Sequence, residues 1–208
     1  MDADMPAGNR PRETSAALSV LLPTKKEPDD PGALVRPTTG RRLATEHWLL
    51  ETLPDALRDR AQWEWRQHRV AILPLGELFS AVRIPERLLT ALRATTGDGR
   101  CLDGFLAEAL DGGPVICDPR TSRYYALVPA TMPATLHQMA EVWRALEVDC
   151  LGSGSYLGVP RVDVVSREHA LASYWSVPMD PAVVLCTPLT VARLIAAAQH
   201  FLNMEPEV

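Results

Sequence analysis

The chain has 208 residues, of which 47 % are hydrophobic and 23 % are charged, and its formal net charge at pH 7 is −5. This composition is that of an ordinary globular protein with one hydrophobic core, and no apolar stretch reaches the roughly 18 residues that cross a bilayer. The negative charge counts against a general nucleic-acid binder, which needs a positive field, although a local positive patch can coexist with a negative total. The N-terminus lacks the basic and apolar segments of a signal peptide, so we expect a cytoplasmic protein with no membrane partner.

Residues 1–42 are rich in Pro, Gly, Thr and charged residues, and we expect them to form a flexible tail. One apolar cluster, "AALSVLL" at 16–22, interrupts this stretch. It is either a short helix that docks on the domain or on a protein partner, or a stray apolar run without a role. Residues 43–208 are expected to form a single domain.

Hydrophobic periodicity and turn residues predict the elements of this domain. Helices are expected over 45–53, 54–68, 85–96, 102–110, 133–147 and 188–202. Strands are expected over 70–75, 79–85, 112–118 and 123–129, with further short strands between 149 and 179. The turn at 119–122 joins two of these strands as a hairpin. Strands separated by single helices predict an α/β (α+β) fold, a mixed β-sheet flanked by helices.

The stretch "LGSGSYLGVPRVD" at 151–163 poses the question of a phosphate cradle. Such a cradle needs a helix directly after its glycines, whereas Tyr156 and the residues after it favour a strand. We therefore interpret "GSGS" as a hairpin turn. Its Ser153 and Ser155, together with the nearby Arg161, are candidates to line a pocket.

Two aspartates on predicted strands are candidates for metal chemistry. Asp118 ends the strand "PVICD" and Asp163 lies in "VDV", and two carboxylates from different strands are what a two-metal phosphoryl-transfer site needs. The simpler interpretation makes Asp118 a turn former and leaves Asp163 facing water. His169 is the histidine placed to meet Asp163.

Aromatic residues and cysteines have ordinary interpretations beside functional ones. Aromatic side chains on a sheet can stack on bases, but core packing is the default for them; they are Tyr124, Tyr125, Tyr156, Tyr174 and Trp175. The four cysteines stand far apart without metal-ligand spacing, so we expect buried, reduced thiols and no metal site.

Five stretches read in order carry a family resemblance: "AVRIP", "GGPV", "YYALVP", "LGSGSYLGVPRVD" and "SYWSVPM". Over residues 60–198 the chain resembles short actinobacterial proteins similar to the N-terminal domain of bifunctional DNA primase/polymerases. The resemblance implies a mixed sheet with flanking helices and a site built from an aspartate pair on one strand, a histidine and a third acidic residue. Here "VICD" offers Asp118 alone, and His169 is the sole match for the histidine.

These observations favour a non-catalytic binding or accessory module similar to a degenerate primase/polymerase-like domain, one that needs no cofactor and binds a nucleotide or nucleic acid. Its ligand pocket is expected to contain Asp118, Arg123, Tyr125, Ser153, Ser155, Tyr156, Arg161 and Asp163. Two alternatives stay open. One is a nucleotidyl or phosphoryl transferase that uses Mg²⁺ or Mn²⁺ on Asp118 and Asp163. The other is a protein interaction scaffold that uses the tail and the tryptophans.

Overall fold

The computed structural model describes residues 31–97, 99–166 and 172–204, with side chains between 39 and 203. Contacts divide the chain after Pro31, and the description below concerns the unit that begins at Gly32. The apolar cluster at 16–22 and most of the expected tail lie outside the described residues. The last twelve residues assigned to the tail, 31–42, are part of the first helix.

The elements follow the predicted order closely. The helices are α1 (Pro31–Leu50), α2 (Asp55–His68), α3 (Glu86–Thr95), α4 (Leu102–Ala109), α5 (Met132–Thr135), α6 (His137–Trp143), the 3-10 turn η1 (Arg144–Leu146) and α7 (Pro188–Met204). The strands are β1 (Val70–Pro74), β2 (Phe79–Pro85), β3 (Val115–Asp118), β4 (Arg123–Pro129), β5 (Asp149–Leu151), β6 (Tyr156–Pro160) and β7 (Tyr174–Val177). Pro54 and Pro85 stand directly before α2 and α3, where a missing N–H costs no hydrogen bond.

The strands form a five-stranded sheet of order β5-β2-β4-β3-β7 and a two-stranded ribbon of β1 and β6. All strand pairs within the described residues are antiparallel. The expected hairpin of β3 and β4 is confirmed, with Asp118 opposite Arg123 across the turn. The predicted fold class is confirmed as well: the domain is α+β, with a sheet flanked by helices. The sheet is antiparallel in all its described pairs, however, and not mixed as expected.

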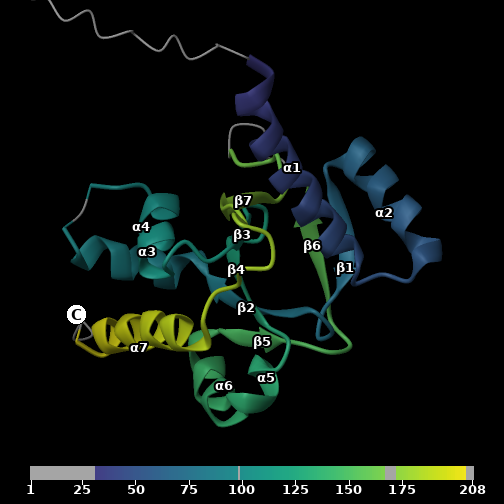
Figure 1. Ribbon diagram of the computed structural model, residues 1–208. Helices are drawn as coiled ribbons and strands as arrows, with labels where there is room; N and C mark the ends of the chain where they lie inside the picture. Colours follow the sequence, from purple (N-terminus) through teal and green to yellow (C-terminus); the bar gives the residue numbers. More distant parts are fainter. Residues whose placement is uncertain (1–30, 98, 167–171, 205–208) are drawn as a thin grey trace, which may run out of the picture. The chain divides into compact units, whose positions relative to one another are not determined.

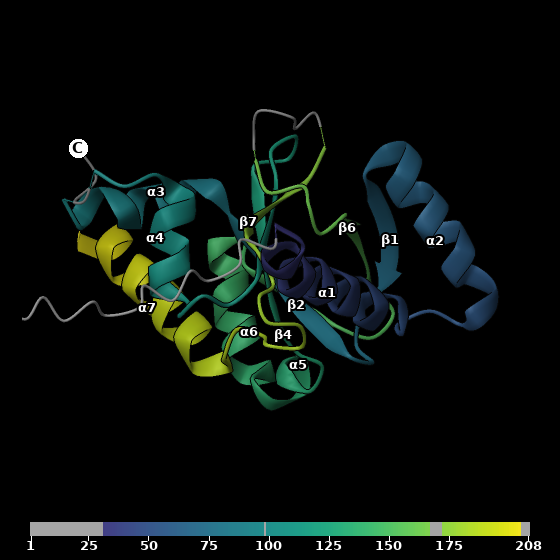
Figure 2. The ribbon, with the colours of Figure 1, turned by 45° about the horizontal axis from the view of Figure 1, so that its top comes forward.

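Two apolar clusters lie on opposite faces of the five-stranded sheet. Val82 and Ile84 of β2 face the cluster formed with α3, α4 and α7, whereas Phe79 and Ala81 face the cluster formed with α1, α2 and the ribbon. This alternation follows from the two-residue period of a strand. Figures 1 and 2 show α3, α4 and α7 on one side of the sheet and α1 and α2 on the other.

No described helix combines the length and the apolar character needed to span a membrane.

Candidate functional site

The structure places the eight candidate residues in three groups. The first is on the β3–β4 hairpin, the second lies in or beside the turn between β5 and β6, and the third follows β6. The groups are Asp118, Arg123 and Tyr125; Ser153, Ser155 and Tyr156; and Arg161 and Asp163. Within the described residues, no hydrogen bond or ion pair joins one group to another.

Asp118 shapes the hairpin turn. Its Oδ1 accepts a hydrogen bond from the backbone N–H of Arg120 at 3.1 Å, and its Oδ2 accepts one from the hydroxyl of Thr121 at 2.8 Å. An aspartate whose side chain binds the backbone two residues ahead is a turn former. Both carboxylate oxygens of Asp118 are therefore used inside the turn.

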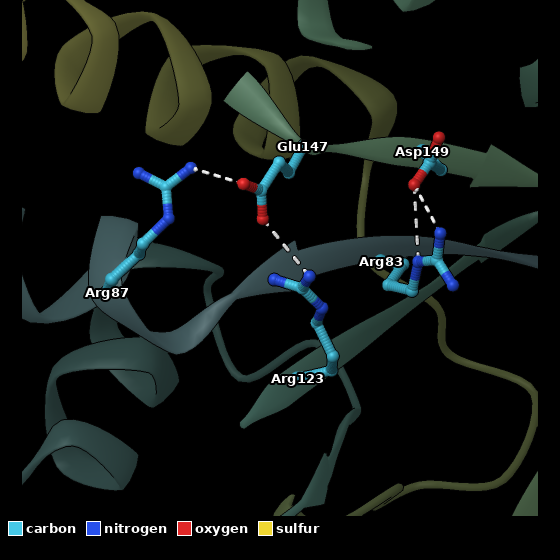
Figure 3. Close-up of polar contacts among 5 residues, drawn as sticks. All are labelled: Arg83, Arg87, Arg123, Glu147 and Asp149. Carbon is cyan, nitrogen blue, oxygen red and sulfur yellow. Dashed lines mark hydrogen bonds and ion pairs between the residues drawn. The ribbon is translucent and has the colours of Figure 1, made fainter. Parts of the chain in front are cut away.

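An ion-pair network lies beside this hairpin and includes Arg123 (Figure 3). Arg83 of β2 donates from Nη2 to Oδ2 of Asp149 at 2.6 Å and from Nε to the same oxygen at 3.2 Å. Glu147 accepts from Arg123 at 3.1 Å and also pairs with Arg87 at 3.1 Å. The network thus ties β2, β4 and the start of α3 to the segment that leads into β5.

Solvent limits what this network contributes. The side chains of Arg87 and Glu147 are 57 % and 54 % exposed, and water screens ion pairs at such positions. The hydrogen bond from Arg123 and the charge of Arg87 lower the pKa of the Glu147 carboxyl. Tyr125 lies opposite Arg83, and burial raises the pKa of its hydroxyl. Sequence reasoning found Arg123 and Tyr125 and missed the partners from other elements, since no spacing connects them.

The glycine-rich turn connects the two sheets. β5 pairs with β2 and β6 pairs with β1, so the predicted hairpin across "GSGS" is wrong. The backbone N–H of Leu75 donates to the carbonyl of Ser155 at 2.9 Å, and a Cβ added to Gly76 would lie 2.3 Å from the backbone nitrogen of Ser153. The chain continues as a strand in which Tyr156 is 69 % exposed. The turn therefore lacks the following helix that a phosphate cradle requires.

The third group lines a cleft that was not predicted from the sequence. Arg161 and Asp163 border a cavity of about 570 Å³ together with Arg42 and Glu46 of α1 and Arg66 of α2. We call this cavity the arginine cleft. Its volume is within the range of small-molecule sites.

The helical signal for this cleft was present in the sequence. Thr39, Arg42, Leu43 and Glu46 are spaced as one face of a helix, and all four line the cleft. The tail was expected to extend to residue 42, which removed half of this face from consideration.

Only some of the charged side chains in the arginine cleft form ion pairs with described residues. Arg161 donates from Nε to Oδ1 of Asp163 at 2.6 Å and from Nη2 to Oδ2 at 2.5 Å, and this hydrogen bonding lowers the pKa of Asp163. Arg42 and Arg66 form no ion pair with any described residue. Partial burial raises the pKa of Glu46, and the charge of Arg161 opposes this effect.

A second cavity adjoins the arginine cleft, sharing Arg42 and Val162 with it. This apolar cleft has a volume of about 280 Å³ and contains Val165, Trp175 and Met179 among its lining residues. Trp175 is buried, and its indole N–H donates to the carbonyl of Pro160 at 3.1 Å, which fixes the ring. A charged cavity and an apolar cavity thus meet at Arg42.

The structure does not bring Asp118 and Asp163 into contact. Asp118 belongs to the β3–β4 turn, whereas Asp163 is paired with Arg161 in the arginine cleft. Among the described residues, no group of three His, Cys, Asp or Glu side chains could hold a metal ion. His169 lies outside the described residues.

No protein-family model matches this chain, and no match was found among the curated proteins or the solved structures.

Proposed function

We propose that this chain is a non-catalytic binding module, similar to a degenerate primase/polymerase-like domain, and that it holds a nucleotide. The observation that carries the proposal is the junction of the arginine cleft with the apolar cleft at Arg42. A nucleotide has a charged end and a planar, largely apolar end, and each cavity suits one of them.

The phosphate end would lie in the arginine cleft. Arg42 and Arg66 come from different helices and carry no ion pair with a described residue, so their guanidinium groups are available to phosphate oxygens. Guanidinium groups bind phosphate in a bidentate manner, and such charge-assisted bonds are stronger than neutral ones. Glu46 and Asp163 leave the lining only weakly positive, which favours a small anion over a long nucleic-acid backbone.

The base would lie in the apolar cleft. Val165, which is 47 % exposed, supplies accessible apolar surface over the buried Trp175 and Met179, while Asp180 and Thr45 add polar groups at the border. Thr45 donates to the carbonyl of Arg41 at 3.1 Å within α1, and Asp180 pairs with Arg41 at 3.6 Å. A site of this type is apolar with a few placed polar groups, as ligand pockets usually are.

Calorimetric titration of the full chain with ATP, GTP, inorganic pyrophosphate and a short single-stranded DNA tests the proposal. We expect a nucleoside triphosphate to bind more tightly than pyrophosphate, without a requirement for metal. Arg66→Ala should weaken binding by about tenfold or more, the effect of losing a charged hydrogen bond. Arg60→Ala is the matched control, because Arg60 is on the same helix and pairs with Glu64 at the surface.

Three results would overturn the proposal. They are the absence of binding at millimolar nucleotide, an equal loss in Arg60→Ala and Arg66→Ala, and tighter binding of DNA than of any nucleotide. A metal-dependent affinity abolished by Asp118→Ala would instead favour the transferase alternative.

A protein-interaction role is the second candidate, favoured by the outer face of the β1–β6 ribbon. Ile72 is 56 % exposed and Tyr156 is 69 % exposed on this face, where Gly158 lies opposite Ile72. Exposed apolar surface of this type marks interaction sites. Size-exclusion chromatography with light scattering, on the wild type and on Ile72→Ser with Tyr156→Ser, tests for self-association through the ribbon.

A further inference from the structure

A polar cavity lies on the opposite face of the five-stranded sheet, away from the arginine cleft. It has a volume of about 400 Å³ and is bordered by α3, the start of α4 and the strands β4 and β7. Its polar lining includes Glu86, Thr90, Arg93, Asp103, Tyr124 and Tyr174. We call it the tyrosine pocket. It shares no lining residue with the arginine cleft or the apolar cleft.

One side of α3 carries polar residues that border the tyrosine pocket, with Glu86 in the first turn and Arg93 in the last turn of the helix. Glu86, Thr90 and Arg93 are spaced by four and three residues, so they lie on the same side of the helix. Leu88 and Leu89 of the same helix are buried in the core. The carboxylate of Glu86 and the hydroxyl of Thr90 make no hydrogen bond or ion pair with the described part of the chain. These two groups are therefore available to a ligand.

Arg93 is held in place from one end. Its Nη1 donates to the carbonyl of Arg100 at 2.8 Å. Its Nε is buried and has no hydrogen-bond partner in the described structure. A buried donor without an acceptor is unusual in folded proteins and needs an explanation, and a bound acceptor is one such explanation.

The floor of the tyrosine pocket is a rigid polar network. Asp103 accepts a hydrogen bond from Ser176 Oγ at 2.5 Å and from the hydroxyl of Tyr174 at 3.3 Å. The thiol of Cys117 lies near the hydroxyls of Tyr124 and Tyr174. Burial raises the pKa of Cys117 and of Tyr174, so both stay neutral. Asp103 is thus a fixed carboxylate beside uncharged donors.

We propose that the tyrosine pocket binds a small zwitterion whose two charges are several bonds apart, such as a dipeptide or an ω-amino acid. The ammonium group would lie between Glu86 and Asp103, and the carboxylate would face Arg93. A simple anion would meet two carboxylates in this pocket, and a simple cation would meet the guanidinium. A ligand that carries both charges satisfies both.

The geometry of α3 sets the separation of the charges. Glu86 and Arg93 are seven residues apart, which places them about 10 Å apart along the helix axis. An α-amino acid is too short to reach between them, whereas a dipeptide is of suitable length. Thr90 lies between the two charged residues and offers a hydroxyl to a central amide group.

Titration of the full-length chain with glycylglycine and ε-aminohexanoate, followed by calorimetry and by amide NMR shifts, tests the proposal. Glycine, hexylamine and hexanoate are the controls for charge separation and for single charges. We expect the two long zwitterions to bind at least tenfold more tightly than any control. The shifted amides should belong to α3 and to residues 101–103.

Two nearly isosteric variants localise the site. Glu86→Gln should weaken binding of both long zwitterions about tenfold, and Thr90→Val should weaken glycylglycine more than ε-aminohexanoate. Glu141→Gln, at an exposed position of α6, should leave the affinities unchanged. Absence of binding at millimolar concentration, equal affinity for hexylamine, or binding unaffected by Glu86→Gln would each overturn the proposal. None of these outcomes bears on nucleotide binding, because that site is on the other face of the sheet.

Discussion

Arg161 and Asp163, two residues apart, form a bidentate ion pair at the border of the arginine cleft, with N–O distances of 2.6 and 2.5 Å. The pair fixes the guanidinium of Arg161 and also neutralises it. A phosphate bound as proposed would meet one positioned but compensated arginine, Arg161, beside Arg42 and Arg66, which form no ion pair with a described residue. Asp163 opposes an anion in this cleft.

Removing the charge of Asp163 should strengthen anion binding. In Asp163→Asn the shape of the side chain is kept while one carboxylate leaves the cleft, so we expect affinity for pyrophosphate to rise about threefold to tenfold. Calorimetric titration measures the change. Asp59→Asn, an exposed position of α2 outside the cleft, should leave the affinity unchanged. A lower affinity in Asp163→Asn would show instead that orientation of Arg161 matters more than its net charge.

Glu46 should make the protein less stable as the pH rises. Burial raises the pKa of its carboxyl above the ordinary value of 4.5. Between the ordinary pKa and the raised pKa of Glu46, the folded state binds more protons than the unfolded state. The free energy of unfolding therefore falls with increasing pH across this window. At pH values above the raised pKa, Glu46 is ionised in both states, and the loss in the free energy of unfolding stays constant.

Glu46→Gln should remove this penalty. At neutral pH the variant should unfold at a higher urea concentration than the wild type, with a gain below about 1 kcal/mol and a melting temperature about 1–3 °C higher. The difference should vanish below pH 4.5, where the wild-type carboxyl is protonated in both states. Glu77→Gln, in an exposed loop, should show no such pH-dependent difference. A Glu46→Gln variant that is less stable than the wild type at neutral pH would contradict a raised pKa for Glu46.

Much of the fold could be predicted because its signals are local. Pro54 and Pro85 mark the starts of α2 and α3, and Asp118 with the following turn residues specifies the β3–β4 hairpin. The expected helix over 133–147 is interrupted at Leu136, whose backbone (φ −109°, ψ 26°) departs from helical geometry and separates α5 from α6. The start of α1 was missed because Pro, Gly and Thr in 31–40 favour loops.

The candidate site was harder to predict because the residues that line it come from distant parts of the chain. Arg161 and Asp163 were identified, but Arg42 and Arg66 belong to helices whose positions against residue 161 depend on tertiary packing. The turn at 152–155 was assigned to a hairpin, since local residues specify a turn but not the sheet that the next strand joins. Hydrogen bonds reaching from α4 to β7, such as Ser176 to Asp103, have no sequence signal at all.

Gly76 should be irreplaceable at the point where the ribbon meets the glycine-rich turn. Its φ is +98°, and a Cβ would lie 2.3 Å from the backbone nitrogen of Ser153. Gly76→Ala should therefore lower the free energy of unfolding by about 3 kcal/mol, from backbone strain and from overpacking. Urea denaturation measures this loss. Gly99→Ala, where a Cβ would meet nothing within 4 Å, should change stability little. Equal losses of stability in Gly76→Ala and Gly99→Ala would contradict the close approach of Gly76 to the backbone of Ser153.

One of the four thiols should react rapidly with an aromatic disulfide reagent, and the other three should react slowly. Only a thiolate reacts, so both exposure and pKa determine the rate. Cys101 is exposed, so the expectation that all four thiols are buried is wrong for this residue. Cys117 is buried, and burial raises its pKa. Burial likewise raises the pKa of Cys150, and it raises that of Cys186 to about 12.

Native protein at pH 8 should thus release one equivalent of chromophore rapidly, and denaturant should release the other three. Cys101→Ser should abolish the fast phase and leave the slow one. Because Cys101 borders the tyrosine pocket, a saturating zwitterion there should also slow its reaction. A fast phase that persists in Cys101→Ser would contradict the assignment of the fast thiol to Cys101, and the half-buried Cys150 would be the first residue to test in its place.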